Sequence, residues 1–489
     1  MGNLMTLVAD LQTMFGSTSV CADPEVLEAY SKDQSFVQPR KPDAIVSLSS
    51  TEHIQELLRY AHTKKVPVVP LSSGMNLHGA TIPSQGGIVL DMSKMNKIVM
   101  IDTDNWSVVI EPGVTAEQLQ NELAPHGLRV MLPFGIHPKR SALTSFIERD
   151  PAVAAASFEY GNDHIMDTEL VLPCGDLFRT GLWSAGGRPG SPLGPVRAMI
   201  NRLWTGAQGT LGIVTKINLK VEYLSQLRRI WLFQFDAFPE LIEPVKLIQR
   251  REIGWECFVI NNFNAAALSC PTWNVPERLP TEAKDPKAFL ALKDSLPPWL
   301  LVVSLNGGPR FPEEKLAYEE EALQEVIRQT GIKRYHNTEV ENILSNEMIR
   351  PWCILKKACY RGSFHDVSFK TTLKRVPEFQ RILLEVLNHY SYPLQDVGVY
   401  VLIIERGRAV HCEIDIHGSS PHEGNGAALK NLWLDLSRCF IDEGAFFDRP
   451  YGAWAEMVYS RAGTYTEKLK QIKKELDPHN ILNPGRLCF

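Results

Sequence analysis

The sequence predicts an α+β fold with two domains. Its 489 residues exceed the usual length of a single domain. Residues 44–69 show a strand, an amphipathic helix and a second strand, which is a unit that delivers a loop at its end. Residues 399–417 instead show two strands joined by a tight turn, which indicates antiparallel pairing. We therefore expect small α+β units first and an antiparallel sheet later in the chain.

The composition is that of a globular protein, with 44% apolar and 22% charged residues. A net charge of -5 and a pI near 6.3 argue against nucleic acid or an anionic membrane surface as a partner. No apolar run approaches the ~20 residues of a membrane span, and the N-terminus lacks the basic region of an export signal. Nine cysteines without a C-x-x-C pair predict reduced thiols, no zinc site and a cytoplasmic location.

The first half of the chain predicts alternating helices and strands. Apolar residues at helical spacing predict helices over 4–14 and 54–61. Two further strands are expected at 88–93 and 107–113. The second strand leads into Thr-Ala-Glu-Gln at 115–118, a capping box that begins the next helix.

The stretch 66–83, VPVVPLSSGMNLHGATIP, is a strand that ends at Pro70 in a loop of Ser, Gly and Asn residues. Glycines and small residues let consecutive backbone N–H groups turn to one side and form an anion-binding nest. Serine hydroxyls add further donors, so a diphosphate would fit. An ordinary strand-to-turn connection is the alternative.

Residues 166–181 predict a hairpin with its turn at 174–176, and residues 183–197 a loop rich in Gly and Pro. Gly206, Gly209 and Gly212 then recur every third residue before an alternating strand. This spacing predicts close backbone approach to something planar or bulky, with a tight packing turn as the alternative.

From Glu222 onward the sequence predicts a second domain. Its expected strands are 229–235, 300–305 and 399–404, and its expected helices are 313–330 and 376–390.

On the second strand of the 399–417 hairpin, His411, Glu413, Asp415 and His417 recur at every second position and share one face. A solvated outer face is one interpretation. Four side chains in a line do not converge tetrahedrally, so no metal site is predicted. We favour the polar wall of a pocket.

The chain closes with a predicted helix at 466–476 and the sequence DPHNILNPGRLCF. Asn480, Asn483, Pro484 and Gly485 predict a tight turn that presents Arg486. The turn contributes to a site only if this tail returns to the first domain.

Three common cofactor and catalytic motifs are missing from the sequence. No G-x-G-x-x-G occurs, which leaves a Rossmann dinucleotide site unsupported. Glycine loops with G-K-[ST] and nucleophile elbows of the G-x-S-x-G type are also missing.

Several motifs in order resemble the vanillyl-alcohol oxidase / p-cresol methylhydroxylase (PCMH-type) family of FAD-linked oxidases. They are PVVPLSSGMNLHGATIP, IEPGVT, YGNDHIMDTELVLPCGDLFRTG, WTGAQGTLGIVTKI and LDPHNILNPGRL. The resemblance implies a PCMH-type FAD-binding domain in two parts, residues 1–222 and a returning segment 450–489. It also implies an α+β cap (substrate) domain at 223–449 with an antiparallel sheet, and a homodimer.

The resemblance assigns the 66–83 loop to the FAD pyrophosphate. The implied cofactor-binding residues are Pro70, Leu71, Ser72, Ser73, Gly74, Met75, Asn76, Gly113, Ser141, Thr144, Ser145, Gly209, Gly212, Ile213, Val214, Asn483 and Arg486. Met75 stands where some related flavoproteins carry a FAD-linking histidine, so non-covalent FAD is expected. A covalent link through His365 is the alternative.

The family's active-site motifs match in part. Asp163 in YGNDH is implied as the acid near flavin N5, and Arg449 matches the arginine of a Tyr–Arg pair that grips a phenolate. Asp448 stands in place of that tyrosine, Tyr451 is expected to shape the cavity, and His78 stands where a second phenolate-binding tyrosine is expected. The arginine favours an anionic substrate group.

Motifs and resemblance together predict an FAD-dependent oxidoreductase that takes a hydride from a small aromatic or anionic alcohol or an alkylphenol-like substrate. His411 and Glu413 are the candidate bases, because both face the proposed pocket and histidine titrates near neutrality. One alternative is a 2-hydroxy-acid dehydrogenase for lactate or glycolate, although its H-x-G-D-G-N-x-H metal stretch is missing. The other is a flavin electron-transfer subunit of a larger redox complex. An external electron-acceptor protein stays open in each case.

Overall fold

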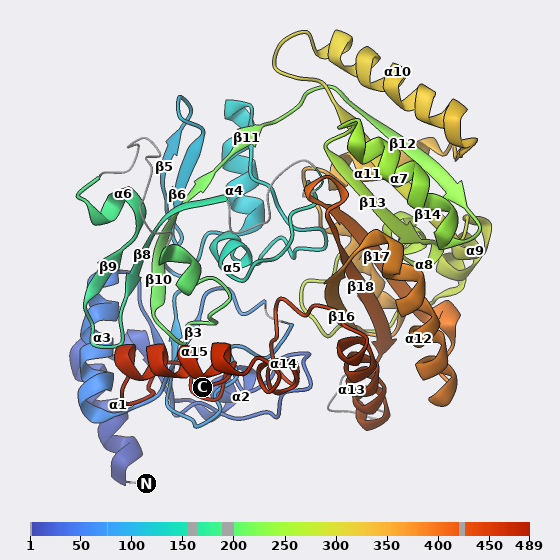
Figure 1. Ribbon diagram of the computed structural model, residues 1–489. Helices are drawn as coiled ribbons and strands as arrows, with labels where there is room; N and C mark the ends of the chain where they lie inside the picture. The colour runs from blue at the N-terminus through green and yellow to red at the C-terminus, as the bar shows by residue number, and fades with distance from the viewer. Residues whose placement is uncertain (1, 76, 155, 157–163, 188–199, 420–425) are drawn as a thin grey trace.

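The computed structural model of the protein describes residues 2–75, 77–154, 156, 164–187, 200–419 and 426–489. A four-stranded sheet of order β1-β2-β4-β3 contains the predicted strand–helix–strand unit, with β2 and β3 both parallel to β4 (Figure 1). Its strands are β1 (Val20–Cys21), β2 (Ala44–Ser47), β3 (Val68–Leu71) and β4 (Ile88–Asp91). The helices of this region are α1 (Gly2–Phe15), α2 (Pro24–Ala29) and α3 (Thr51–Lys64). The buried face of α3 is the predicted one, made of Ile54, Leu57, Leu58 and Ala61.

An antiparallel sheet of order β5-β6-β10-β8-β9 follows. Its strands are β5 (Ile98–Asp102), β6 (Ser107–Ile110), β8 (Ile165–Val171), β9 (Leu177–Arg179) and β10 (Ile213–Lys220). Helices α4 (Ala116–Leu123) and α5 (Ala142–Ile147) share a core with it, and a two-stranded ribbon joins β7 (Leu128–Arg129) to β11 (Glu222–Tyr223). The predicted hairpin is confirmed as β8–β9.

Two local expectations differ from the structure. Only half of the capping box forms: the Thr115 side chain accepts a hydrogen bond from Gln118 N, but the Gln118 side chain donates to Asn96 O at 3.2 Å. Helix α6 (Gly181–Ser184) covers the start of the stretch expected to be a loop, and residues 188–197 of that stretch lie outside the described residues.

The later part of the chain forms a seven-stranded antiparallel sheet of order β15-β12-β14-β13-β17-β18-β16. Its strands are β12 (Arg228–Phe235), β13 (Glu256–Asn261), β14 (Trp299–Asn306), β15 (Lys333–Arg334), β16 (Ser363–Thr371), β17 (Val397–Ile404) and β18 (Ala409–Gly418). The predicted 399–417 hairpin is β17–β18, with Tyr400 opposite Glu413.

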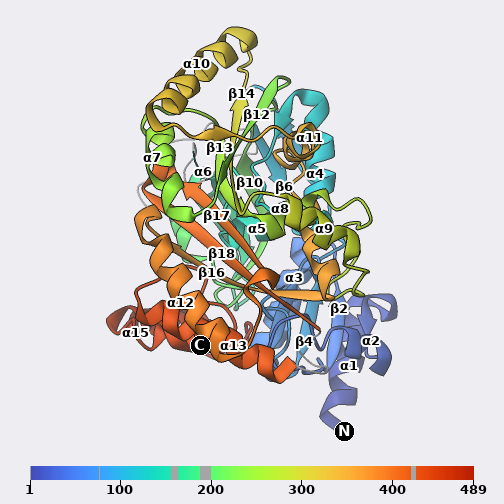
Figure 2. The ribbon, with the colours of Figure 1, turned by 90° about the vertical axis from the view of Figure 1, so that its right-hand side faces the viewer.

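Helices cover both faces of this sheet, as Figure 2 shows with α7 and α12 on one side and α8 and α9 on the other. One face packs against α7 (Ile242–Arg250), α10 (Pro312–Thr330), α12 (Val376–His389) and α13 (Gly426–Asp442). The other face packs against α8 (Asn262–Ser269), α9 (Lys287–Ser295) and α11 (Thr338–Glu347). No helix in the described ranges is both long and apolar enough to cross a bilayer.

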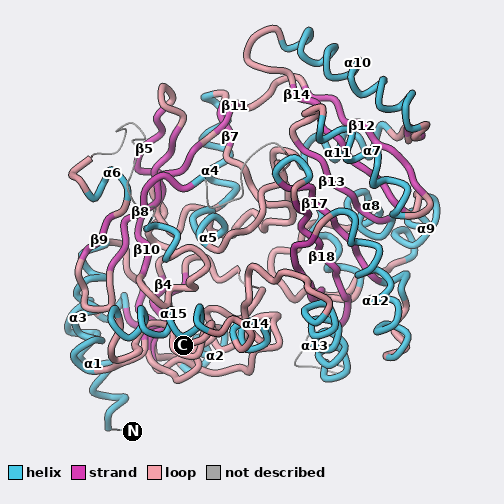
Figure 3. The backbone as a smooth tube through the Cα atoms, in the orientation of Figure 1, coloured by secondary structure: helices cyan, strands magenta, loops and turns pink. Residues whose placement is uncertain are grey.

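The C-terminal tail returns to the first sheet after α14 (Trp454–Tyr459) and α15 (Thr464–Leu476). Leu482 bridges Val68 of β3 in parallel, and Asn483 N donates to Val68 O at 2.9 Å. Asn480, Asn483 and Gly485 have the positive φ angles of the predicted turn. Figure 3 shows that loops fill much of the space between the five-stranded sheet and the seven-stranded sheet. Residues of these loops line the cavities described next.

Candidate functional site

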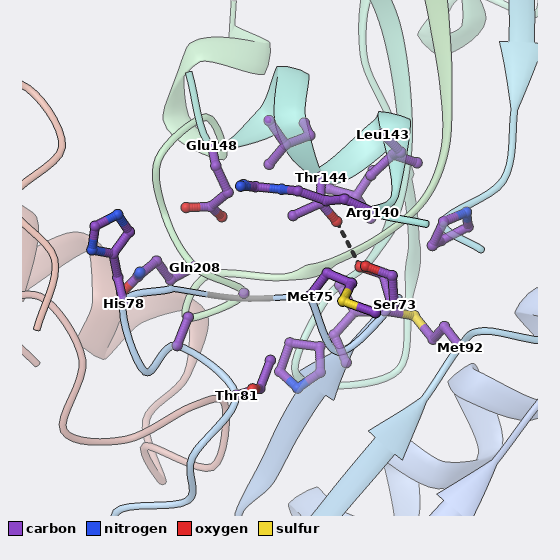
Figure 4. A pocket seen from close by; sticks show the side chains of 18 of the residues that line it. Ser73, Met75, His78, Thr81, Met92, Arg140, Leu143, Thr144, Glu148 and Gln208 are labelled. Carbon is purple, nitrogen blue, oxygen red and sulfur yellow. Dashed lines mark hydrogen bonds between the residues drawn. The ribbon is translucent and has the colours of Figure 1, made fainter. Parts of the chain in front are cut away.

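The loop after β3 is tied to the start of α5. The Ser72 hydroxyl lies 2.7 Å from the Thr144 hydroxyl, the dashed line in Figure 4. Ser141 N donates to Ser73 Oγ at 3.0 Å, and Gly74 has a φ of +69°. The two segments are far apart in sequence, and these contacts bring the implied cofactor residues together.

The predicted glycine turn before β10 packs on the end of β3. Gly209 has a φ of +70°, and a Cβ there would lie 2.3 Å from Cγ of Pro70. A Cβ on Gly212 would lie 2.6 Å from Leu170. The tight packing turn is therefore present, and the same glycines also line a cavity.

This cavity, here the loop cavity, lies between the β3 loop, α5, the glycine turn and residues 449–451, with about 950 Å³ of space, part of it open to solvent. Many of the implied cofactor residues line it: Pro70, Ser72, Ser73, Gly74, Met75, Thr144, Gly209, Gly212, Ile213 and Val214. Three predicted substrate-site residues, His78, Arg449 and Tyr451, line it as well.

The remaining implied cofactor residues are not on its wall. Leu71 lines a neighbouring cavity, and Ser145 lies behind the wall, where its hydroxyl donates to Ser141 O. Gly113 packs so close to Ser93 that a Cβ would lie 2.3 Å from its carbonyl oxygen.

Two of these residues come from the tail, and one lies outside the described residues. Asn483 donates to Ala80 O and Gln208 O and so fixes the tail beside the cavity, whereas Arg486 lines another cavity. Asn76 and the implied acid Asp163 lie outside the described residues.

Two buried acceptors on the wall of the loop cavity, Glu148 Oε2 and Gln208 Oε1, have no hydrogen-bond partner among the described residues (Figure 4). Burial raises the pKa of Glu148 to about 6. Since unpaired buried acceptors are costly, a ligand with N–H or O–H donors would complete this wall. Neither residue was among the predicted site residues, although Gln208 lies inside the motif WTGAQGTLGIVTKI and Glu148 lies just beyond the implied contacts at 144–145.

A second cavity, here the strand cavity, opens against β17 and β18 and has about 600 Å³ of space, part of it open to solvent. His411 and Glu413 line it, together with Tyr400 and the rings of Phe134 and Phe364. It shares four residues with the loop cavity, namely His78, Arg140, Asp150 and Arg449. The predicted polar wall therefore adjoins the predicted cofactor loop.

Lys357, on the 3-10 helix η6 (Cys353–Tyr360), anchors the polar face of β18. Its Nζ lies 2.9 Å from Glu413 Oε1 and 2.7 Å from Asp415 Oδ2. Burial works against ionisation of Glu413, but Lys357 and then His411 hold the pKa of Glu413 well below its usual range. Burial and the neighbouring Glu413 raise the pKa of Asp415. No periodic pattern marks Lys357 in the sequence.

The solvated-face interpretation of β18 is wrong, because His411, Asp415 and His417 are all buried. His411 Nε2 lies 3.9 Å from Glu413 Oε2, and His411 Nδ1 has no partner among the described residues. His417 does not line the strand cavity but lies 4.4 Å from the Phe263 ring. Only the first half of the polar face forms a cavity wall.

Arg449 is already paired. Asp150 accepts from Arg449 through one carboxylate oxygen and from Arg140 through the other, at 2.8 Å. Tyr451 donates to the backbone oxygen of Glu148 at 3.1 Å.

The other two predicted substrate residues also have charged neighbours. His78 Nε2 lies 3.8 Å from Asp366. Asp448 pairs with Lys370 at 2.9 Å and lines neither cavity.

Comparison with known proteins places this geometry in a family. Residues 42–181 match a family model described as "FAD binding domain". The glycolate oxidase subunit GlcD of Bacillus subtilis is 33% identical over 476 residues, which cover 94% of this chain and 91% of that protein. The chain belongs to the PCMH-type family of FAD-linked oxidoreductases.

Two further similarities support the assignment. A probable mitochondrial D-lactate dehydrogenase of Danio rerio is 28% identical over 217 residues, which cover 44% of this chain and 42% of that protein. The crystal structure of p-cresol methylhydroxylase with substrate bound superposes with a TM-score of 0.82 at 20% identity, covering 100% of this chain and 97% of that one. The fold is thus the PCMH-type fold, and the protein is an FAD-dependent oxidoreductase.

Proposed function

We propose that this flavoenzyme oxidises a small, uncharged aromatic alcohol or alkylphenol in the strand cavity. The observation that carries the proposal is that His411 and Glu413 line a cavity which shares His78, Arg140, Asp150 and Arg449 with the loop cavity. A substrate between them would have a proton acceptor on one side and the cofactor on the other.

We further propose that the loop cavity takes FAD. The Ser-Gly loop suits a diphosphate, and the donors of FAD would satisfy Glu148 Oε2 and Gln208 Oε1. In this proposal residues 1–222 and 450–489 form the FAD-binding domain, and residues 223–449 form the cap. When bound, the flavin supplies hydride acceptance.

In the mechanism that we propose, His411 takes the proton of the substrate hydroxyl, and ionised Glu413 stabilises the resulting imidazolium. Lys357 keeps Glu413 ionised and fixes its position. Phe134, Phe364 and Tyr400 would hold the substrate ring. Asp163 stays a predicted acid near flavin N5.

The formal charges on the strand cavity wall favour an uncharged substrate. Three cations, Arg140, Lys357 and Arg449, face three carboxylates, Asp150, Asp366 and Glu413. With the arginines already paired, a substrate carboxylate would meet no surplus of positive charge. Oxidation of a 2-hydroxy acid is the second candidate, supported by the similarity to a glycolate oxidase subunit and a D-lactate dehydrogenase.

Anaerobic titration of the purified holoprotein with aromatic alcohols, alkylphenols and 2-hydroxy acids separates these candidates. Bleaching of the flavin band near ~450 nm, as expected of a reduced flavin, reports each productive substrate. We expect bleaching by an aromatic alcohol or an alkylphenol. Bleaching by hydroxy acids alone would favour the second candidate, and bleaching by none would support an electron-transfer subunit.

Further parts of the proposal are non-covalent FAD, a cytoplasmic homodimer and, as one alternative, an external protein as electron acceptor. Acid precipitation tests the FAD linkage, since a yellow pellet would indicate covalent FAD, for which His365 is the candidate residue. Light scattering tests the homodimer.

A further inference from the structure

Tyr400 on β17 has a buried hydroxyl to which the proposed mechanism gives no role. The side chain is 3% exposed and lines the strand cavity. Its hydroxyl has no hydrogen-bond partner among the described residues. Because a buried hydroxyl without a partner is costly, a ligand oxygen that accepts a hydrogen bond would complete this part of the wall.

Each charged side chain on the wall of the strand cavity already has a partner. The pairs are Arg140 and Arg449 with Asp150, Lys357 with Glu413, and His78 with Asp366. Among the described residues of this wall, three buried polar side-chain atoms have no partner: Arg140 Nε, His411 Nδ1 and the Tyr400 hydroxyl. Asp150 holds Arg140 through another nitrogen, so His411 and Tyr400 are the side chains best placed to meet a ligand.

Tyr400 and His411 are neighbours on the β17–β18 hairpin. Tyr400 lies directly opposite Glu413, which makes Tyr400 and His411 a diagonal pair on one face of the sheet. Their ring centroids are 6.4 Å apart. The rings of Phe134 and Phe258 lie 4.9 and 5.6 Å from the Tyr400 ring and fix its position. A hydroxyl group between the two side chains would therefore meet both of them.

The two side chains have complementary roles toward such a hydroxyl. His411 Nε2 lies 3.9 Å from Glu413 Oε2, so we assign the imidazole proton to Nε2 and the acceptor role to Nδ1. Burial, and then the charge of Glu413, raise the pKa of Tyr400 well above its usual range, so Tyr400 keeps its proton and acts as the donor. A fixed donor stabilises an oxygen that gains negative charge more than it stabilises an uncharged hydroxyl.

We propose that Tyr400 is a second catalytic residue, whose hydroxyl donates a hydrogen bond to the alcohol oxygen that His411 deprotonates. The O–H bond of the alcohol breaks, and its proton goes to His411. The C–H bond at the same carbon breaks, and its hydrogen leaves with both electrons as a hydride to the oxidised cofactor. A C=O bond forms, and its oxygen still accepts from Tyr400. This inference rests on the proposed function, which it deepens by choosing the aromatic alcohol among the candidate substrates.

Ligand binding to the oxidised holoprotein tests the contact without turnover. Acetophenone carries a carbonyl oxygen like that of the expected product, and 2-phenylpropene replaces this oxygen with a CH₂ group at nearly the same shape. Calorimetry measures both binding constants. The preference for acetophenone over 2-phenylpropene should fall about 3- to 10-fold in Tyr400→Phe, the value of one hydrogen bond. Tyr318→Phe, the same change at a 73% exposed position, should leave the preference as it is.

The reaction should respond more strongly than binding. Tyr400→Phe should slow flavin reduction at saturating aromatic alcohol by about 10²–10³, the usual cost of removing one donor to a developing oxyanion. FAD content and reduction by dithionite should not change. The free energy of unfolding should not fall, because the hydroxyl has no partner among the described residues. A purely structural hydroxyl would instead lower the unfolding free energy.

An acetophenone preference that Tyr400→Phe leaves unchanged would overturn the proposal, and so would an unchanged rate of reduction by an aromatic alcohol. The binding measurement also separates this inference from the proposed function. If no alcohol of the substrate panel bleaches the flavin but Tyr400→Phe still lowers the preference, the proposed function is wrong and the contact between Tyr400 and a ligand oxygen is supported.

Discussion

The loop cavity and the strand cavity adjoin, yet they are built in different ways. The wall of the loop cavity contains many Ser, Gly, Thr and Pro residues from a few short segments. The strand cavity has charged and aromatic side chains, and its Glu413 depends on Lys357, which lies 56 residues earlier in the chain. The comparison teaches that a site made by backbone conformation follows from local motifs, whereas a site made by charge depends on distant partners.

The strand cavity should be most sensitive at Lys357. Lys357→Met leaves Glu413 and Asp415 without their cation, so the free energy of unfolding should fall by about 3–5 kcal/mol. Urea unfolding of the holoprotein measures this loss. Lys374→Met, at an exposed position, is the control. Equal losses in the two variants would mean that the strand cavity does not depend on the charge of Lys357, and the distinction between the two cavities would no longer hold.

His411 tests the chemistry of the same wall. His411→Ala should slow single-turnover flavin reduction by about 10²–10⁴, the usual contribution of a general base. FAD content should not change, because His411 does not line the loop cavity. His389→Ala, on the exposed side of α12, is the control. A rate equal to that of the unmodified enzyme would exclude His411 as the base.

Burial of His417 should make the free energy of unfolding depend on pH. Burial lowers the pKa of His417 to about 3. Below pH ~6.5 the unfolded chain therefore binds a proton at this histidine that the folded protein does not bind. Stability is therefore lost as the pH falls, by about 2 kcal/mol at pH 5.

In His417→Phe this contribution to the pH dependence disappears. Unfolding free energies of both proteins at pH 7 and pH 5 should show a drop about 2 kcal/mol smaller in the variant. Equal drops would mean that His417 titrates normally in the folded protein.

The loop cavity should respond to backbone shape rather than to charge. Gly209→Ala places a methyl group against Pro70, so FAD should bind about tenfold more weakly, in the range of overpacking effects. Gly127→Ala is the matched control, with φ of +67° and nothing within 4 Å of the new Cβ. Both variants should lose about 1–2 kcal/mol of unfolding free energy to left-handed strain. Gly127→Ala should nevertheless keep its FAD affinity, as titration of the FAD-free protein would show.

Several features were predictable because they depend on neighbours in the sequence. Spacing of apolar residues predicted the buried face of α3, and alternation predicted the β17–β18 hairpin. The short strand β5 was missed, and its residues are only half-buried or exposed, so it lacks a strong pattern.

The candidate site was predictable in part. Resemblance to a known family supplied the loop residues, and most of them line one cavity. Glu148, Gln208 and Lys357 were not predicted as site residues. Their part in the site depends on burial for Glu148 and Gln208 and on ion pairing for Lys357, and the spacing of residues along the sequence predicts neither.

The sequence alone determined the order of the elements, the two glycine-rich segments and the alternation that puts His411 and Glu413 on one face. These follow from steric preferences and from the period of two in a strand, which act over a few residues. Only the tertiary structure decided that this face is buried, that Lys357 balances its charge and that the returning tail, which the resemblance implied, meets the first sheet at β3. Burial and long-range pairing set those properties, since the energy of a charge depends on its surroundings in space.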